Sequence, residues 1–189
     1  AKQDWSKEIR AKWMKTDKEN ISVAPLVVGG TEIFDNRDIV DRPDKSQLRG
    51  EFICGRYTKA NVEDLKMAVD TAKSDPDGWR NLTRDERHKV LSNVAIEVRK
   101  RRGDLIGVAA AEVGKVFTET DVEVSEAVDF LEFYSQSTRY FEDLNNLRFE
   151  GKGVGLVTPP WNFPIAIPLG GVAASLATGN TVIVKPASD

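Results

Sequence analysis

The sequence has few of the residues on which disulfides and many metal sites depend. Its 189 residues include one cysteine, Cys54, and one histidine, His88. A single cysteine excludes a disulfide within the chain, and a single histidine excludes a metal site built from several histidines. We therefore expect no metal site in this chain.

Long apolar runs and an excess of one charge are also missing. No apolar run approaches the roughly 20 residues that span a bilayer, and the first residues do not resemble a signal peptide. The 27 lysines and arginines and 30 acidic residues are mixed along the chain, without the basic stripe that nucleic acid requires. We expect no membrane span, no nucleic-acid partner and, from the cysteine content, a cytoplasmic setting.

The first part of the chain is expected to form a polar helix followed by a hairpin. Residues 1–24 carry Trp5, Ile9 and Trp13 at helical spacing, which indicates a surface helix or a linker. Short apolar runs flank Gly29-Gly30, and glycines readily adopt the positive φ angles of a tight turn. These runs predict a hairpin over Pro25–Ile33.

A loop, a strand and a series of helices are predicted next. The polar stretch Asp35–Gly50 contains Pro43 and indicates a loop, and Glu51–Tyr57 indicates a strand. Apolar residues at helical spacing then predict helices with Asn61 as the first N-cap and a capping box at the start of the second. Their expected bounds are Asn61–Ser74, Thr83–Arg101, Asp104–Val113 and Thr118–Leu144.

Residues 151–189 are predicted to form one βαβ unit. An apolar strand at 153–158 precedes an almost wholly apolar helix, Ile165–Ala177, and the β-branched run Thr181–Val184 is typical of a parallel strand buried on both faces. Such a strand needs neighbouring strands and covering helices. We expect the chain to be a truncated part of a longer protein, rather than a small complete protein that ends in an edge strand.

The turn between the predicted strand and helix is the best candidate for chemistry. It contains Asn162 among three prolines and follows the carboxyl end of a strand, where open parallel sheets bind ligands. An asparagine in a rigid turn can hold its amide toward an oxyanion without reorganising. The alternative, which the residues alone leave open, is that Asn162 caps the following helix.

Three segments in this order and spacing resemble the aldehyde dehydrogenase superfamily. They are Pro160-Trp161-Asn162-Phe163-Pro164, Gly179-Asn180-Thr181-Val182 and Lys185-Pro186-Ala187. Within the superfamily the chain looks most like the 1-pyrroline-5-carboxylate dehydrogenases, either standalone or as the dehydrogenase half of a bifunctional proline utilization enzyme. These enzymes oxidise L-glutamate γ-semialdehyde to L-glutamate with a nicotinamide cofactor.

The resemblance implies an α/β fold that is the N-terminal part of an aldehyde dehydrogenase. Residues 1–24 would be a helix or linker, and residues 25–150 the hairpin, strand and helical part of the cofactor domain. Residues 151–189 would be the first βαβ unit of a Rossmann-like domain, truncated. The parent protein is expected to be a homo-oligomer that acts on a small aldehyde.

The resemblance also implies roles for individual residues. Asn162 would hold the oxyanion formed when a cysteine attacks the aldehyde, and Lys185 would bind the hydroxyls of the adenosine ribose. The expected cofactor is NAD, but Ser188 stands where many members have a glutamate that disfavours a 2′-phosphate, which leaves NADP open. The residues that would line the nicotinamide side of the cofactor are Thr158, Pro159, Pro160 and Trp161.

Two further residues are implied to contact the substrate. Glu126 matches an acidic residue placed near the α-amino group of the semialdehyde, and Phe163 matches an aromatic wall. The alternative for Glu126 is that it belongs, with Glu123 and Asp129, to a solvated helix face.

Cys54 is not expected to be the nucleophile that the resemblance implies. It lies in an early strand, whereas the nucleophile of the family follows the cofactor domain, so we interpret Cys54 as a packed or half-exposed thiol and His88 as a solvated helix residue. Residues 1–189 alone are therefore expected to be inactive. Two alternatives remain, another small-aldehyde specificity and a non-catalytic binding or assembly module.

Overall fold

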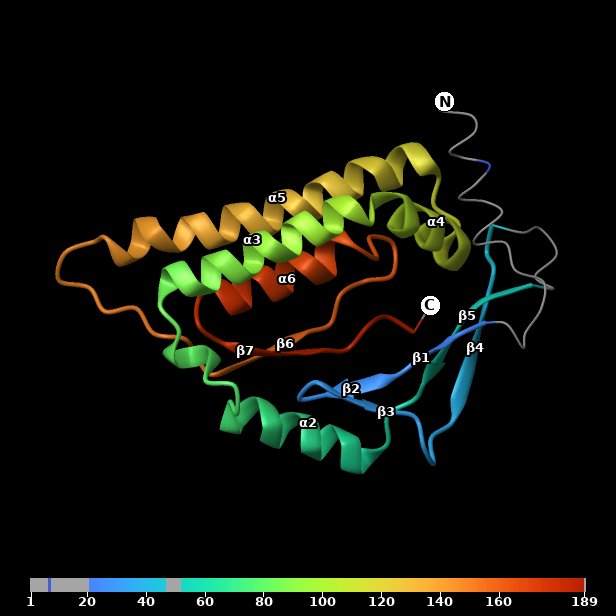
Figure 1. Ribbon diagram of the computed structural model, residues 1–189, viewed down its shortest axis with the longest axis horizontal. Helices are drawn as coiled ribbons and strands as arrows, with labels where there is room; N and C mark the ends of the chain where they lie inside the picture. Colours follow the sequence, from blue (N-terminus) through green and yellow to red (C-terminus); the bar gives the residue numbers. More distant parts are fainter. Residues whose placement is uncertain (1–6, 8–20, 47–51, 189) are drawn as a thin grey trace. The chain divides into compact units, whose positions relative to one another are not determined.

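The computed structural model describes residues 7, 21–46 and 52–188 (Figure 1). The chain divides into two compact units. The first unit comprises residues up to Met67 together with Arg102–Asp121, and the second comprises Ala68–Arg101 and the residues from Val122 onward. The predicted N-terminal helix around Trp5, Ile9 and Trp13 lies outside the described residues.

The first unit is built on a mixed three-stranded sheet. Strand β5 (Ile53–Thr58) lies in the centre, parallel to β1 (Val23–Ala24) and antiparallel to β4 (Ile39–Pro43). The predicted hairpin is confirmed, because β2 (Leu26–Val28) and β3 (Thr31–Ile33) pair antiparallel around Gly29-Gly30. Both glycines have positive φ, 55° and 77°.

Strand β4 shows that the prediction of a loop over Asp35–Gly50 was wrong where residues 39–43 are concerned. Pro43 indicates a loop in the sequence because proline cannot donate to a sheet ladder. In the structure Pro43 is the last residue of an edge strand, at a point where the register with β5 shifts. Proline is tolerated at sheet edges and bulges, so it ends β4 without preventing it.

Helix α4 (Arg102–Val113) packs on this sheet, in contact with β4 and β5. The Lys45 N–H donates to the Ala111 carbonyl at 2.7 Å, and Ile106 and Ala109 are buried. The helix begins two residues before the predicted Asp104, so Gly103 lies within its first turn instead of separating it from the helix before.

Helix α2 (Val62–Ser74) begins in the first unit with the predicted cap. Asn61 Oδ1 accepts from the Asp64 N–H at 2.9 Å, and Asp64 Oδ2 accepts from the Asn61 N–H at 2.8 Å. The same carboxylate binds the Arg37 guanidinium in two hydrogen bonds, of 2.7 Å from Nε and 2.6 Å from Nη2. Asp64 is buried, so the three hydrogen bonds that its carboxylate accepts satisfy a charge that would otherwise be costly in the interior.

The second unit is layered around helix α6 (Ala166–Ala177). On one side lie α3 (Arg84–Lys100) and most of α5 (Phe117–Glu142), and on the other lies the strand pair β6 (Val154–Val157) and β7 (Thr181–Val184) (Figure 1). The short 3-10 helix η2 (Trp79–Asn81) precedes α3. The core residues with almost no exposure include Leu91, Ala95, Val124, Ala127, Leu131, Ala166 and Ala173.

The local signals of this unit are confirmed by the structure. Thr83 and Glu86 form the predicted capping box at the start of α3, and β6, α6 and β7 form the predicted parallel βαβ unit. Two adjacent glycines let α6 lie close to its neighbours. A Cβ on Gly170 would stand 2.8 Å from the Phe130 ring, and one on Gly171 would stand 2.9 Å from a Val157 methyl group.

The outer face of the strand pair is more exposed than the sequence predicted. Within the described chain, Leu156 is 65% exposed and Val184 is 43% exposed. Helix α6 buries one stripe of small residues, whereas Ile167 is 40% exposed. Among the described residues, no helix combines the length and the apolar character needed to cross a membrane.

Candidate active site

The candidate site begins where the two parallel strands end together. Val157 of β6 pairs with Val184 of β7, and the Lys185 N–H donates to the Val157 carbonyl at 2.9 Å. This bond extends the hydrogen bonding between the strands one residue past β7. Thr158 and Lys185 therefore leave the sheet side by side at its carboxyl edge. Ligands of open parallel sheets bind beyond this edge.

The turn Thr158–Pro164 is exposed in its middle and anchored at its end. Trp161 is 50% exposed and Phe163 is 38% exposed, and Asn162 is exposed as well. The next two residues, Ile165 and Ala166, are buried at 7% and 0% exposure. Asn162 is therefore exposed to solvent in a turn whose following residues, Ile165 and Ala166, are buried.

The alternative that Asn162 caps α6 is not supported. The N-cap position of α6 is occupied by Ile165, whose side chain makes no capping hydrogen bond. The first helical N–H groups instead donate to a carboxylate from another helix. Glu123 Oε1, on α5, accepts from the Ile165 N–H at 2.7 Å and from the Ala166 N–H at 3.0 Å.

Glu123 is the residue of this site whose place the sequence interpretation missed. We offered a solvated helix face as one interpretation of the acidic residues of α5, but Glu123 is only 1% exposed. A signal was present, because Glu123 precedes the buried Ala127 by four residues and so lies on the apolar side of the helix. The interpretation was wrong for this residue.

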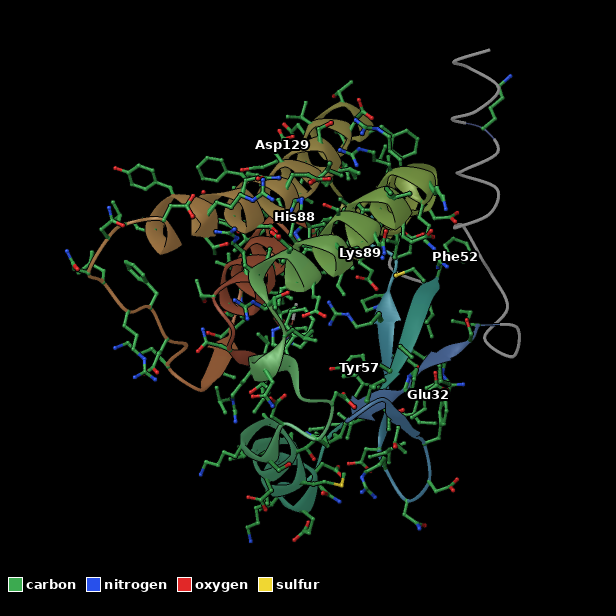
Figure 2. The ribbon with its side chains drawn as sticks, turned by 60° about the vertical axis from the view of Figure 1, so that its left-hand side comes forward. Glu32, Phe52, Tyr57, His88, Lys89 and Asp129 are labelled. Carbon is green, nitrogen blue, oxygen red and sulfur yellow. The ribbon has the colours of Figure 1, made fainter. Side chains whose placement is uncertain are left out.

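The other two acidic residues lie progressively further from the interior. Glu126 follows Glu123 by three residues, on the same side of α5, and is half-buried. Asp129, one turn further on, is exposed (Figure 2). Of the three carboxylates, Glu123 is thus held by backbone groups, Glu126 lies at the boundary with solvent, and Asp129 faces water.

Two of the residues after β7 are polar and exposed. Lys185 and Ser188 are both exposed, and Lys185 leaves the sheet at the same carboxyl edge as Thr158. Hydroxyl and ammonium groups at such an edge are suited to a sugar or phosphate group. Within the described ranges, no cluster of three or more histidine, cysteine, aspartate or glutamate side chains is placed to hold a metal ion.

Cys54 is confirmed as a packed thiol of the first unit. It is 7% exposed in the central strand β5, with Sγ 3.5 Å from the Arg42 carbonyl oxygen. Burial, and after it the negative charges of Glu112 and Asp44, raises the pKa of the Cys54 thiol to about 12. A cavity of about 280 Å³ is lined in part by Cys54, and burial and protonation both keep the thiol from reacting.

The interpretation of His88 as a solvated residue was wrong. His88 is half-buried between α3 and α5, with Nδ1 2.6 Å from Ser135 Oγ and Nε2 3.1 Å from Gln136 Nε2 (Figure 2). Ser92 Oγ donates to Glu132 at 3.0 Å in the same network. These contacts tie the two helices together.

Comparison with known proteins agrees with this geometry. The aldehyde dehydrogenase family matches residues 46–189. A 1-pyrroline-5-carboxylate dehydrogenase of Geobacillus sp. (strain WCH70) is 33% identical over 174 residues, which cover 87% of this chain and 33% of that protein. The chain thus spans about a third of the length of the relatives it matches.

Solved structures extend the similarity to the fold. Proline utilization A from Bdellovibrio bacteriovorus has a TM-score of 0.86 and 28% identity, over 99% of this chain and 20% of that one. A Thermus 1-pyrroline-5-carboxylate dehydrogenase with bound NAD has a TM-score of 0.82 and 28% identity, over 98% of this chain and 36% of that one. The predicted α/β fold, the N-terminal part of an aldehyde dehydrogenase, is confirmed. The chain belongs to the aldehyde dehydrogenase family.

Proposed function

We propose that this chain is part of an NAD(P)-dependent dehydrogenase that oxidises L-glutamate γ-semialdehyde, the open form of 1-pyrroline-5-carboxylate, to L-glutamate in proline catabolism. The observation that carries the proposal is the exposed Asn162 turn, which leaves the sheet beside Lys185 at the carboxyl edge. The relatives named 1-pyrroline-5-carboxylate dehydrogenase support the choice of substrate.

The proposed role of Asn162 follows from the charge that develops during the reaction. When a thiolate adds to the aldehyde carbon, a carbon–sulfur bond forms and the carbonyl electron pair moves onto oxygen. The Asn162 amide would donate a hydrogen bond to that oxyanion, and its stiff turn would hold the donor in place beforehand. Bound NAD(P) would supply the hydride acceptor, and water would then hydrolyse the resulting thioester.

The thiolate would come from outside residues 1–189. Cys54 is the one cysteine in the sequence, and its thiol, with a pKa of about 12, is almost entirely protonated near neutral pH. We therefore expect no measurable aldehyde oxidation by residues 1–189 alone, and at best weak binding of NAD.

The carboxyl edge of β6 and β7 fits a dinucleotide. Its exposed groups would bind the nicotinamide side through Thr158–Trp161 and the adenosine ribose through the Lys185 ammonium. Ser188, also exposed, would leave room for either ribose form, so NAD and NADP need to be compared directly. We propose NAD as the primary cofactor.

Glu126 and Phe163 are the proposed substrate contacts. Glu123, three residues before Glu126 on α5, touches the backbone just after Phe163-Pro164. The half-buried Glu126 carboxylate on the same side of the helix would attract the α-amino group of the semialdehyde, and the partly exposed Phe163 ring would contact its apolar part. An aldehyde without an amino group would gain nothing from Glu126.

The test is oxidation of glutamate semialdehyde and propanal by the whole protein, followed as NADH formation. Glu126→Ala is expected to raise KM for the semialdehyde and to leave propanal oxidation unchanged. Asp129→Ala, which removes an exposed carboxylate from the same helix, is the matched control.

Equal effects of Glu126→Ala on both aldehydes would favour a dehydrogenase of another specificity. No oxidation of any aldehyde, with NAD binding retained, would favour a binding or assembly module and would contradict the proposed activity.

A further inference from the structure

We infer that Glu123 is a positioning residue for the Asn162 amide, an inference that rests on the proposed function. Its carboxylate oxygen accepts the N–H groups of Ile165 and Ala166, at 2.7 and 3.0 Å, from a side chain that is 1% exposed. Both bonds are buried, and both join α5 to the base of the turn that carries Asn162.

The need for this carboxylate comes from the helix that it contacts. The first N–H groups of an α-helix have no partners within the helix, and the aligned peptide dipoles favour a negative charge there. Ile165 at the N-cap of α6 offers no side-chain acceptor. Glu123 takes the place of a capping residue from another part of the chain, and charged hydrogen bonds of this kind are stronger than neutral ones.

The connection from Glu123 to Asn162 is short and stiff. Only Phe163 and Pro164 separate Asn162 from Ile165, and the φ angle of Pro164 is fixed by its ring. A shift of the Ile165 and Ala166 N–H groups is therefore passed to Asn162 rather than absorbed by the turn.

Other contacts of α6 lie further along the helix. Gly170 approaches Phe130 and Gly171 approaches Val157, one turn or more beyond Ala166, and Arg87 Nε donates to the Ala177 carbonyl at 3.1 Å at the far end. The start of α6 is also packed, since Ile165 and Ala166 are buried, and there Glu123 adds two charged hydrogen bonds to the backbone.

The experiment places Glu123 variants of the whole protein in two backgrounds, wild type and Asn162→Ala. In the wild-type background, Glu123→Ala is expected to lower kcat for glutamate semialdehyde by up to about 10²-fold, because small misplacements of a catalytic group cost that much. Glu123→Gln keeps an uncharged acceptor at the same place and is expected to restore most of kcat.

In the Asn162→Ala background, Glu123→Ala is expected to lower kcat by less than about threefold, since the amide that it positions is gone. The dissociation constant for NAD, measured by calorimetry, is expected to change by less than about threefold in all variants, because Lys185 lies outside the turn. Glu119→Gln removes an exposed charge one turn earlier on α5 and is the matched control.

The inference would be overturned if the double variant lost kcat by the product of the two single-variant losses, because Glu123 would then act independently of Asn162. If Glu123→Ala does not fold, Glu123→Gln and Glu123→Asp are compared in the same two backgrounds. A kcat of Glu123→Gln as low as that of Glu123→Ala would also overturn the inference. A normal kcat for Asn162→Ala alone would instead contradict the proposed role of Asn162, so the two failures are distinguishable.

Discussion

The sheet of the first unit encloses the one cysteine of the chain, whereas the strand pair of the second unit presents its polar residues beyond the ends of its strands. Cys54 lies inside the central strand β5, with a strand on each side and α4 in contact with the sheet. Asn162 and Lys185 follow β6 and β7, which are parallel, so both leave at one edge. The place of a side chain along its strand, rather than its intrinsic reactivity, decides whether it is available for chemistry.

The largest expected effect concerns the thiol. A pKa raised from 9.0 to about 12 lowers the thiolate fraction of Cys54 near pH 8 about a thousandfold, and the thiolate is the form that reacts. Iodoacetamide is therefore expected to alkylate the Cys54 peptide about 10³-fold faster in urea than in the native protein, as measured by mass spectrometry. Comparable alkylation rates in urea and in the native protein would contradict the claim that the first unit protects its thiol.

The next effect concerns the exposed turn. Asn162→Ala in the whole protein is expected to lower kcat for glutamate semialdehyde about 10²- to 10³-fold, because one oxyanion donor is lost. Cys54→Ser is expected to leave kcat within about twofold, since a buried neutral thiol takes no part in the reaction. A large loss with Cys54→Ser would mean that the first unit holds the nucleophile after all.

A smaller effect is expected for the lysine at the carboxyl edge. Lys185→Ala should raise the dissociation constant for NAD about tenfold to a hundredfold, the range for losing a charged hydrogen bond. Lys152→Ala, which removes an exposed lysine just before β6, serves as the control at the opposite end of the strand. Equal weakening by both variants would show a general charge effect instead of a site at one edge.

The smallest expected effect is a difference in stability between variants of two tryptophans of the second unit, Trp79 and Trp161. Trp79 Nε1 donates to the Leu176 carbonyl at 3.1 Å, near the end of α6, so Trp79→Phe is expected to lower the free energy of unfolding by about 1 kcal/mol. Trp161→Phe removes an indole that is 50% exposed in the turn and should leave stability unchanged. Urea titrations followed by circular dichroism measure both, and a reversed ranking would contradict the structural role of Trp79.

Features set by neighbouring residues were predictable from the sequence. The Thr83–Glu86 capping box, the Gly29-Gly30 hairpin and the β6–α6–β7 unit depend on short-range hydrogen bonds and on the period of the apolar residues. Strand β4 was missed because its proline lies at a sheet edge, and whether a strand is an edge strand depends on which strands pair in space.

In the candidate site, too, the features set by neighbouring residues were predictable and those set by distant partners were not. Motifs around Asn162 and Lys185 are continuous in sequence, and they identified the turn and the strand end. The roles of Glu123 and His88 depend on which helix faces which, and their partners lie 42 and 47 residues away along the chain. No local pattern specifies such a partner, although the apolar spacing of α5 already placed Glu123 on the buried side.

The Asp64 carboxylate has a consequence for how the protein tolerates acid. Hydrogen bonds from Arg37 and then from the Asn61 N–H hold the pKa of Asp64 below its usual value of 3.8. A lowered pKa in the folded state stabilises the protein at every pH above the unfolded value, and this contribution is lost as the pH falls through the folded one. Because one carboxylate completes both the cap of α2 and the ion pair with Arg37, a single protonation weakens both, and acid acts on the start of α2 and on its link to Arg37 together.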